Sequence, residues 1–165
     1  MDIIIRLLAD GFVIVIFLMA AYLLLTKTQS KNIYDTYTRI FMAGITSYVL
    51  AKLVGSVWQP EQLRPFEQLG LDPGAAYLNN PGFPSDHALL AFFLVFAVWY
   101  ATRNRRLTLV LTGLALLMCL GRVLALVHTP LDIAGSFVIA AIGALWYIPY
   151  AKKDLDTHIA KRAKK

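Results

Sequence analysis

Two histidines and an aspartate have the residue types and the spacing that phosphoryl transfer requires. His128 and Asp132 are four residues apart, and His87 opens a different apolar segment. Four residues correspond to about one turn across the start of a helix. A carboxylate that holds one imidazole nitrogen leaves the other free to attack, and a second histidine can donate a proton to the leaving group. The three residues can therefore supply a nucleophile, its orienting group and a general acid.

Basic residues and helix starts near these groups could bind phosphate oxygens. Lys52, Arg64 and Arg122 supply up to three positive charges; arginine offers a planar fork and lysine a point charge. Ser85 and Thr129 are well placed to cap helices, whose N-termini direct free N–H groups and a positive dipole end toward an anion. A phosphate monoester or diphosphate is the ligand that these groups favour.

A membrane-embedded helical bundle has to position these residues. Of the 165 residues, 58% are hydrophobic and 16% are charged, which excludes an ordinary cytosolic domain and a disordered chain. The single cysteine excludes a disulfide framework and a multi-cysteine zinc site.

We expect an all-α transmembrane domain over residues 1–150 and a basic cytoplasmic tail over residues 151–165. A spanning helix needs about 20 mostly apolar residues, and five stretches qualify: Ile3–Leu25, Ile40–Trp58, Ser85–Thr102, Leu107–Val127 and Leu131–Tyr150.

The distribution of lysine and arginine predicts the orientation of the bundle. Most of them lie in the first connection, in the third connection and in the tail, with Lys27, Lys31 and Arg39 assigned to the first connection. The positive-inside rule makes this side cytoplasmic. The N-terminus, the loop of residues 59–84 and the turn around His128 then face outward. We therefore expect a multi-pass protein of the cytoplasmic (inner) membrane whose site opens to the periplasmic or extracellular side.

Each candidate residue also has a purely structural interpretation. Lys52 could extend from its helix to the interface, the histidines could be interfacial, and Ser85 could be a helix cap only. Their order, spacing and shared membrane level favour a site. The aromatic-rich loop of residues 59–84 either borders a lipid entry path or packs as a cap over the bundle.

Two further patterns concern helix contacts rather than chemistry. Arg6 and Asp10 are four residues apart and are expected to form an ion pair near the start of the first span. Ser136, Ala140 and Ala144 form a stripe of small residues that permits close helix approach, which we expect within the monomer.

The three polar segments resemble the tripartite signature of the type 2 phosphatidic acid phosphatase superfamily. This family includes membrane lipid phosphatases, soluble acid phosphatases and vanadium haloperoxidases, and its pattern is Lys-x6-Arg-Pro, then Pro-Ser-Gly-His, then Ser-Arg-x5-His-x3-Asp. The resemblance runs from Lys52 to Asp132, and the spacing from Arg122 to His128 and Asp132 fits without adjustment.

The resemblance implies a role for each matching residue. His128 would be the nucleophile that forms a phosphohistidine, with Asp132 orienting it, and His87 would be the general acid and later the base for water. The implied chemistry is that of a metal-independent phosphatase without a cofactor. The phosphate would be bound by Lys52, Arg64, Ser85 and Arg122.

Three positions depart from the family pattern. Eleven residues separate Lys52 from Arg64 where the family has six, and Gly121 replaces the family serine. Asp86 replaces the glycine after Ser85. We expect the Asp86 backbone N–H to bind phosphate, and its carboxylate either to pair with a basic residue or to tune His87.

The Pro-Ser-Asp-His and Arg-Pro-Phe segments resemble undecaprenyl diphosphate phosphatases of this superfamily. The implied reaction is hydrolysis of undecaprenyl diphosphate to the monophosphate and inorganic phosphate at the outer face, a step in cell wall biogenesis. Phosphatidic acid, phosphatidylglycerophosphate or a lipid A phosphate are alternative substrates. A non-enzymatic binder or carrier of anionic lipids could use the same basic pocket. The expected partners are the lipid substrate and membrane lipids, with no nucleic acid, and the sequence does not indicate an oligomeric state.

Overall fold

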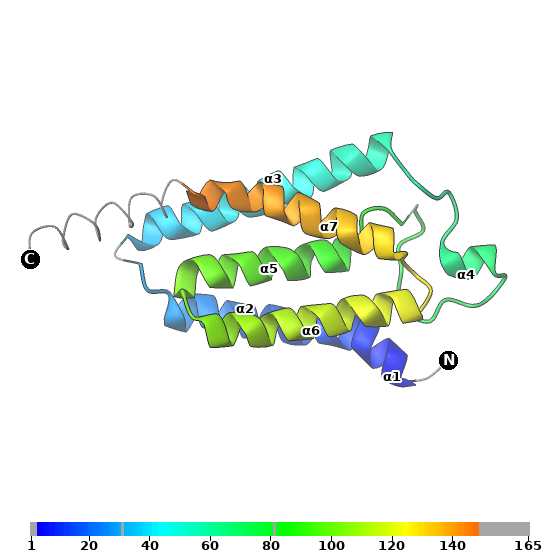
Figure 1. Cartoon of the computed structure of the whole chain (residues 1–165), viewed down its shortest axis with the longest axis horizontal. Coiled ribbons are helices and arrows are strands. Elements are labelled where there is room, and N and C mark those ends of the chain that lie inside the picture. The colour runs from blue at the N-terminus through cyan, green and yellow to red at the C-terminus, as the bar shows by residue number, and fades with distance from the viewer. Residues whose placement is uncertain (1–2, 31, 81, 149–165) are drawn as a thin grey trace, which may run out of the picture.

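The apolar segments fold as helices that run along one long axis (Figure 1). The computed structural model describes residues 3–30, 32–80 and 82–148, and these contain helices and no strand. The first helix is continuous but changes winding, with a π-helical turn, η1, between two α-helical parts. The elements are α1 Ile3–Arg6, η1 Leu7–Gly11, α2 Phe12–Lys27, α3 Ile33–Val57, α4 Pro65–Gln68, α5 Asp86–Thr102, α6 Arg105–Leu124, α7 Pro130–Gly143 and the 3-10 turn η2 Ala144–Tyr147.

Four of the described helices are long and apolar enough to cross a membrane: Ile3–Lys27, Ile33–Val57, Arg105–Leu124 and Pro130–Tyr147. Their outer faces expose large apolar side chains, such as Leu18 at 61% and Leu109 at 69%. A soluble monomer rarely exposes so much contiguous apolar surface, whereas lipid can cover it. The predicted all-helical membrane bundle is confirmed.

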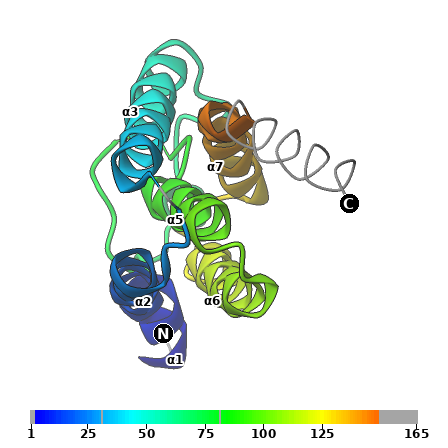
Figure 2. The ribbon, with the colours of Figure 1, turned by 90° about the vertical axis from the view of Figure 1, so that its left-hand side faces the viewer.

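The fifth predicted span has a different position from the other four. Helix α5 has 17 residues and lies at the centre of the bundle, with α2, α3, α6 and α7 around it (Figure 2). Most of its side chains are buried, and those facing its neighbours include Ala88, Ala91, Val95 and Val98. Protein rather than lipid therefore covers most of this helix. An apolar sequence alone does not distinguish these two surroundings, because both favour the same residue types.

Side-chain caps fix where four of the helices begin. Asn32, Ser85, Asn104 and Thr129 each accept a hydrogen bond from the backbone N–H three residues later. Each such cap is worth about 1 kcal/mol, because it satisfies an N–H that the helix leaves without a partner. The caps Ser85 and Thr129 therefore set the positions of His87 and Asp132 within their first turns.

The second span begins earlier than predicted. Helix α3 starts at Ile33 rather than at Ile40 because Asn32 caps it there. Arg39 consequently lies inside the helix and not in the connection, where it pairs with Asp35 at 3.0 Å. Lys31 and the predicted basic tail of residues 151–165 lie outside the described residues, and the orientation of the bundle stays a prediction.

Segments far apart in the sequence meet at one end of the bundle. Helix α1, helix α4 and the turn between α6 and α7 lie together there (Figure 1). The connection between α3 and α5, here named the cap loop and comprising residues 58–80 and 82–85, covers this end. The end therefore brings together the three polar segments that carry the candidate site residues.

Candidate active site

A cavity of about 310 Å³ opens at the end of the bundle beneath the cap loop. Its lining comes from α3, α5, α6, the cap loop and the turn before α7. This volume is at the lower end of the range for small-ligand sites. Six of the predicted site residues line it: Lys52, Arg64, Asp86, His87, Arg122 and His128.

His128 is held by the carboxylate that the spacing predicted. Its Nδ1 lies 3.3 Å from Asp132 Oδ2, and both residues are 4% exposed. The same oxygen accepts a hydrogen bond from the Thr129 backbone N–H at 2.8 Å, while Thr129 Oγ1 accepts from the Asp132 N–H at 3.2 Å. This reciprocal capping box locks the carboxylate at the start of α7. Since Nδ1 is engaged, Nε2 is the ring nitrogen that remains for a substrate.

Burial keeps the His128 imidazole in its neutral form. Removal from water lowers the pKa of His128 below its usual value of 6.5, and the nearby charges of Arg122 and Arg64 lower it further. The hydrogen bond to Asp132 raises this pKa but does not reverse the net direction. A neutral imidazole has the lone pair that a nucleophile needs.

His87 lines the same cavity from a different element. It occupies the first turn of α5, whereas His128 lies in the turn before α7. The two helix starts are joined directly: Ser136 Oγ donates to the carbonyl of Ser85 at 2.9 Å and can donate to that of Asp132 at 2.8 Å. These buried hydrogen bonds fix the spacing of the two histidines. Sequence reasoning assigned Ser136 to a packing stripe, and no motif signalled its polar contacts.

Ser85 has a supporting position rather than a place in the cavity lining. It is fully buried, and its Oγ accepts the Ala88 N–H at 3.5 Å as the N-cap of α5. Its own N–H donates to the Asp132 carbonyl at 3.4 Å. The described structure thus places Ser85 where it orients the start of α5.

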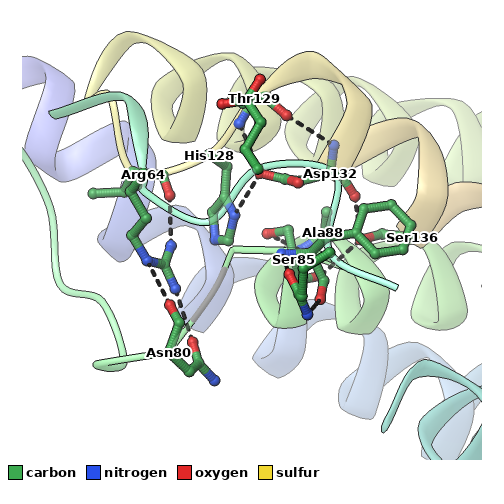
Figure 3. A network of polar contacts seen from close by, with 12 residues as sticks. Arg64, Asn80, Ser85, Ala88, His128, Thr129, Asp132 and Ser136 are labelled. Carbon is green, nitrogen blue, oxygen red and sulfur yellow. Dashed lines mark hydrogen bonds and ion pairs between the residues drawn. The ribbon is translucent and has the colours of Figure 1, made fainter. Parts of the chain in front are cut away.

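Arg64 is fixed almost completely by the backbone. Nη1 donates to the Val127 carbonyl at 2.5 Å, Nε donates to the Asn80 carbonyl at 3.2 Å, and Nη2 donates to the Leu78 carbonyl at 3.2 Å and to Asn80 Oδ1 at 3.0 Å. Figure 3 shows the His128 ring between Arg64 and Asp132. Of the five N–H groups of a guanidinium, one on Nη1 is left for a substrate. Burial lowers the pKa of Arg64, but arginine starts so high that the side chain stays charged.

The backbone of Gly82 passes close to Asp132, His128 and Arg64. Sequence analysis did not assign a role to this glycine. A Cβ built at this position would lie 3.2 Å from Asp132 Oδ2, 3.5 Å from His128 Nδ1 and 3.6 Å from Arg64 Nη1. An added side chain would crowd the carboxylate and lie in van der Waals contact with the imidazole. The glycine therefore lets the cap loop pass directly over the proposed nucleophile.

Arg122 pairs with Asp10, which sequence analysis assigned to Arg6. Its Nη1 donates to Asp10 Oδ1 at 2.8 Å and to the Ala76 carbonyl at 2.8 Å. The predicted pair of Arg6 with Asp10 is wrong. The π-helical turn over Leu7–Gly11 alters the spacing of side chains around the helix, and Asp10 reaches Arg122 instead.

Lys52 and Asp86 form an exposed ion pair at the rim of the cavity. The Lys52 Nζ lies 2.9 Å from Asp86 Oδ1, and the two side chains are 46% and 40% exposed. The expectation that Asp86 pairs with a basic residue is confirmed. Lys52 reaches the cavity despite its longer separation from Arg64, because the extra residues are accommodated in the cap loop.

The cap loop packs on the bundle through its aromatic residues. Phe66 and Phe83 are 5% and 7% exposed. Phe83 meets Trp58 edge-on at 4.7 Å, and a Cβ at Gly135 would come within 2.3 Å of the Phe83 ring. Phe66 and Phe83 therefore pack as a cap, whereas Leu69, Leu71 and Leu78 of the same loop are 52–62% exposed. The loop combines a packed part with an exposed apolar part, and a border to a lipid entry path stays a prediction.

Metal-binding side chains do not gather anywhere in the described part of the chain. No group of three or more His, Cys, Asp or Glu residues within residues 3–30, 32–80 and 82–148 could hold an ion.

Comparisons with known proteins agree with the tripartite motif. A family model described as the PAP2 superfamily matches residues 35–156, which is most of the chain. The bacitracin transport permease protein BcrC of Bacillus licheniformis is 29% identical over 131 residues. The alignment covers 78% of this chain and 61% of that protein, so the chain spans less than two thirds of its relative's length. No solved structure matches the chain.

Proposed function

Because the chain belongs to the PAP2 superfamily, we propose that it is a membrane lipid phosphatase that works in the cavity described above. One observation carries the proposal: two histidines from different elements line one cavity together with two buried arginines, and a carboxylate holds one of the histidines. A site for anion binding alone needs the arginines but neither a nucleophile nor a general acid. The combination favours phosphoryl transfer.

The proposed reaction has two displacements. His128 Nε2 attacks the phosphorus, an N–P bond forms, and the bond from phosphorus to the leaving oxygen breaks as His87 donates a proton to that oxygen. His87 then takes a proton from water, whose oxygen attacks the phosphohistidine. Inorganic phosphate leaves and both histidines return to their starting states. Arg64 and Arg122 stabilise the charge on the equatorial oxygens.

We propose undecaprenyl diphosphate as the substrate, cleaved to the monophosphate and inorganic phosphate at the outer face of the cytoplasmic membrane. The Pro-Ser-Asp-His segment and the Arg-Pro-Phe segment support it, and so does the rim pair of Lys52 and Asp86. A diphosphate entering the cavity would place one phosphate among the buried arginines and the other beside Lys52. The lipid tail would stay along the apolar outer surface of the bundle.

Two other functions compete with this one. Phosphatidic acid, phosphatidylglycerophosphate or a lipid A phosphate could present a monoester to the same arginines. The second alternative is a non-hydrolytic binder or carrier of anionic lipids that uses the same basic pocket; the Bacillus licheniformis relative is named a bacitracin transport permease. A carrier would bind lipid phosphates without releasing phosphate.

Phosphate release by the purified protein tests the proposal. The wild type and His128→Ala are assayed in detergent with undecaprenyl diphosphate, phosphatidic acid, phosphatidylglycerophosphate and a lipid A phosphate, each with a chelator present. We expect release to be fastest from the diphosphate and absent in His128→Ala. Asp35→Asn, which removes an ion pair near the other end of α3, serves as the control and should resemble the wild type. Retained release in His128→Ala would contradict the mechanism.

A further inference from the structure

A carboxylate from the first helix closes one wall of the cavity. Asp10 Oδ1 accepts a hydrogen bond from Arg122 Nη1, and Asp10 Oδ2 accepts one from the Ala76 N–H at 2.9 Å. Arg122 Nη1 also donates to the Ala76 carbonyl. The three groups form a ring of hydrogen bonds that joins the first helix, α6 and the cap loop. Asp10 thus fixes the arginine and the loop at once.

Asp10 reaches this place through a close approach of two helices. A Cβ at Gly121 would lie 2.7 Å from the Ala9 backbone nitrogen and 2.8 Å from Leu8 Cβ. Real side chains do not tolerate such distances to backbone, so any larger residue would push the first helix away from α6. Gly121 is the position at which this chain departs from the family serine. The π-helical turn that follows Arg6 then carries Asp10 past Gly121 to Arg122.

Arg122 depends on this contact more than Arg64 depends on any one partner. Its side chain is 1% exposed, and Asp10 supplies the carboxylate paired with it. Its Nε is buried without a hydrogen-bond partner among the described residues, although the residue lines the cavity. A buried guanidinium that keeps a free donor is suited to an incoming anion. The hydrogen bond from Arg122 Nη1 to Asp10 sets the orientation of the guanidinium and therefore the position of its Nε–H.

From this geometry we propose that Asp10 is a positioning residue that aligns Arg122 with the phosphate of the substrate through the Asp10–Arg122–Ala76 ring. The proposal rests on the proposed phosphatase function, since it concerns the same cavity. Asp10 lies before residue 35, where the family match begins, so the residue belongs to a part of the chain that the family model does not describe. Asp10 touches Arg122 and does not itself have to touch the substrate.

Asp10→Asn is the direct test, because asparagine preserves the shape and removes the charge and one acceptor. We expect kcat/KM for phosphate release to fall about 10- to 100-fold, as is usual for a small displacement of a group that binds the reacting phosphate. Vanadate resembles the transition state, and its inhibition constant should rise by at least about tenfold. An inhibition constant does not depend on the fraction of protein that is folded. A merely structural role for Asp10 would therefore leave it unchanged.

Two further variants separate positioning from folding. In an Arg122→Lys background, Asp10→Asn should lower activity by less than about threefold, because the two residues act through one interaction. Gly121→Ala keeps both charges and should reproduce the losses of Asp10→Asn by moving the first helix away. Asp35→Asn is the matched control, since it breaks another carboxylate–arginine pair far from the cavity.

The outcomes distinguish this proposal from the proposed function. If the wild type releases no phosphate from any lipid, the proposed function fails. If the wild type is active and Asp10→Asn has unchanged kcat/KM and unchanged vanadate inhibition, the positioning role alone is overturned. Tighter vanadate binding with undiminished turnover would also overturn it, because Asp10 would then only neutralise Arg122. Additive losses in the Arg122→Lys background would assign Asp10 to helix docking and overturn it as well.

Discussion

The cavity has a buried wall and an exposed rim, and both carry charges of the same types. On the wall, Arg64, His128 and Asp132 are each at most 5% exposed. Arg64 donates to four acceptors, and Asp132 contacts both the Thr129 N–H and the His128 ring. At the rim, the Lys52 and Asp86 side chains are 46% and 40% exposed and form an ion pair with each other. Water screens the rim pair, whereas the wall groups act at low dielectric. Position, rather than residue type, decides what each charge contributes.

Among variants that keep both histidines, the largest effect should come from Arg64, the arginine with the most partners on the wall. Arg64→Lys keeps a positive charge but loses the fork that reaches Leu78, Asn80 and Val127. Activity should fall about 100-fold or more, as for removal of a preorganised anion donor. Buried carbonyls left without a donor cost about 1–3 kcal/mol each, so the thermal midpoint measured in detergent should also drop. A loss of activity below tenfold with an unchanged midpoint would show that the wall is not preorganised by this residue.

Asp132→Asn should rank next and should also change the pH dependence. Activity should fall about 100-fold or more because the carboxylate no longer stabilises the imidazole. Burial lowers the pKa of His128 below 6.5. The wild type should therefore lose activity only at pH values below 6.5, where His128 takes up a proton. The hydrogen bond to Asp132 raises the pKa of His128, so the variant should lose activity at still lower pH.

Profiles of kcat/KM against pH check this shift. Protonation of the substrate phosphate affects both proteins equally, so the difference between the two profiles isolates His128. An acid limb that moves to higher pH in Asp132→Asn would mean that the carboxylate does not act on the imidazole in this way.

Sequence analysis predicted some contacts of the cavity and missed others. The spacing of His128 and Asp132 within one helix turn was sufficient to pair them, and long apolar runs were sufficient to place the helices. The carbonyls of Leu78 and Val127 that hold Arg64 have no side-chain signature. Asp10 looked like a partner for Arg6 because a regular α-helix was assumed, and a π-helical turn changes which residues face each other.

The sequence also left open what surrounds α5. Lipid and protein interior select the same apolar side chains, so periodicity gave no sign that this helix lies at the centre of the bundle. Gly82 likewise has no motif that marks it, although it lies against three site residues at once. Close approach is a property of the folded arrangement and not of local sequence.

A smaller effect is expected at Ser136, which contacts the wall residues without lining the cavity. Ser136→Ala removes the hydroxyl that joins the Ser85 and Asp132 carbonyls. Loss of one net hydrogen bond costs about 1 kcal/mol, so the thermal midpoint should drop by a few degrees and kcat should fall several-fold. Ser56→Ala removes an exposed hydroxyl bonded within its own helix and should do neither. Equal behaviour of the two variants would contradict the supporting role of Ser136.

The rim should give the smallest change in stability. Lys52→Met and Asp86→Asn break an exposed pair that is worth about 0–1 kcal/mol, so the thermal midpoint should stay within about two degrees of the wild type. Lys52→Met should slow diphosphate hydrolysis by less than about tenfold and should leave hydrolysis of a monoester nearly unchanged, since the monoester places no second phosphate at the rim. A loss as large as that of Arg64→Lys would remove the distinction between wall and rim.

The most direct test is to trap the phosphorylated enzyme. Undecaprenyl diphosphate labelled in its terminal phosphate is mixed with the His87→Ala variant, and the protein is denatured and digested after short times. Water attack should be slowed more than transfer to His128 in this variant, because a phosphate leaving group needs less help from a general acid than water needs from a base. We predict label on the peptide containing His128, in an acid-labile and alkali-stable bond, and none when His128 is also replaced by alanine. Phosphate release by the active protein without labelled His128, or label on another residue, would contradict the account.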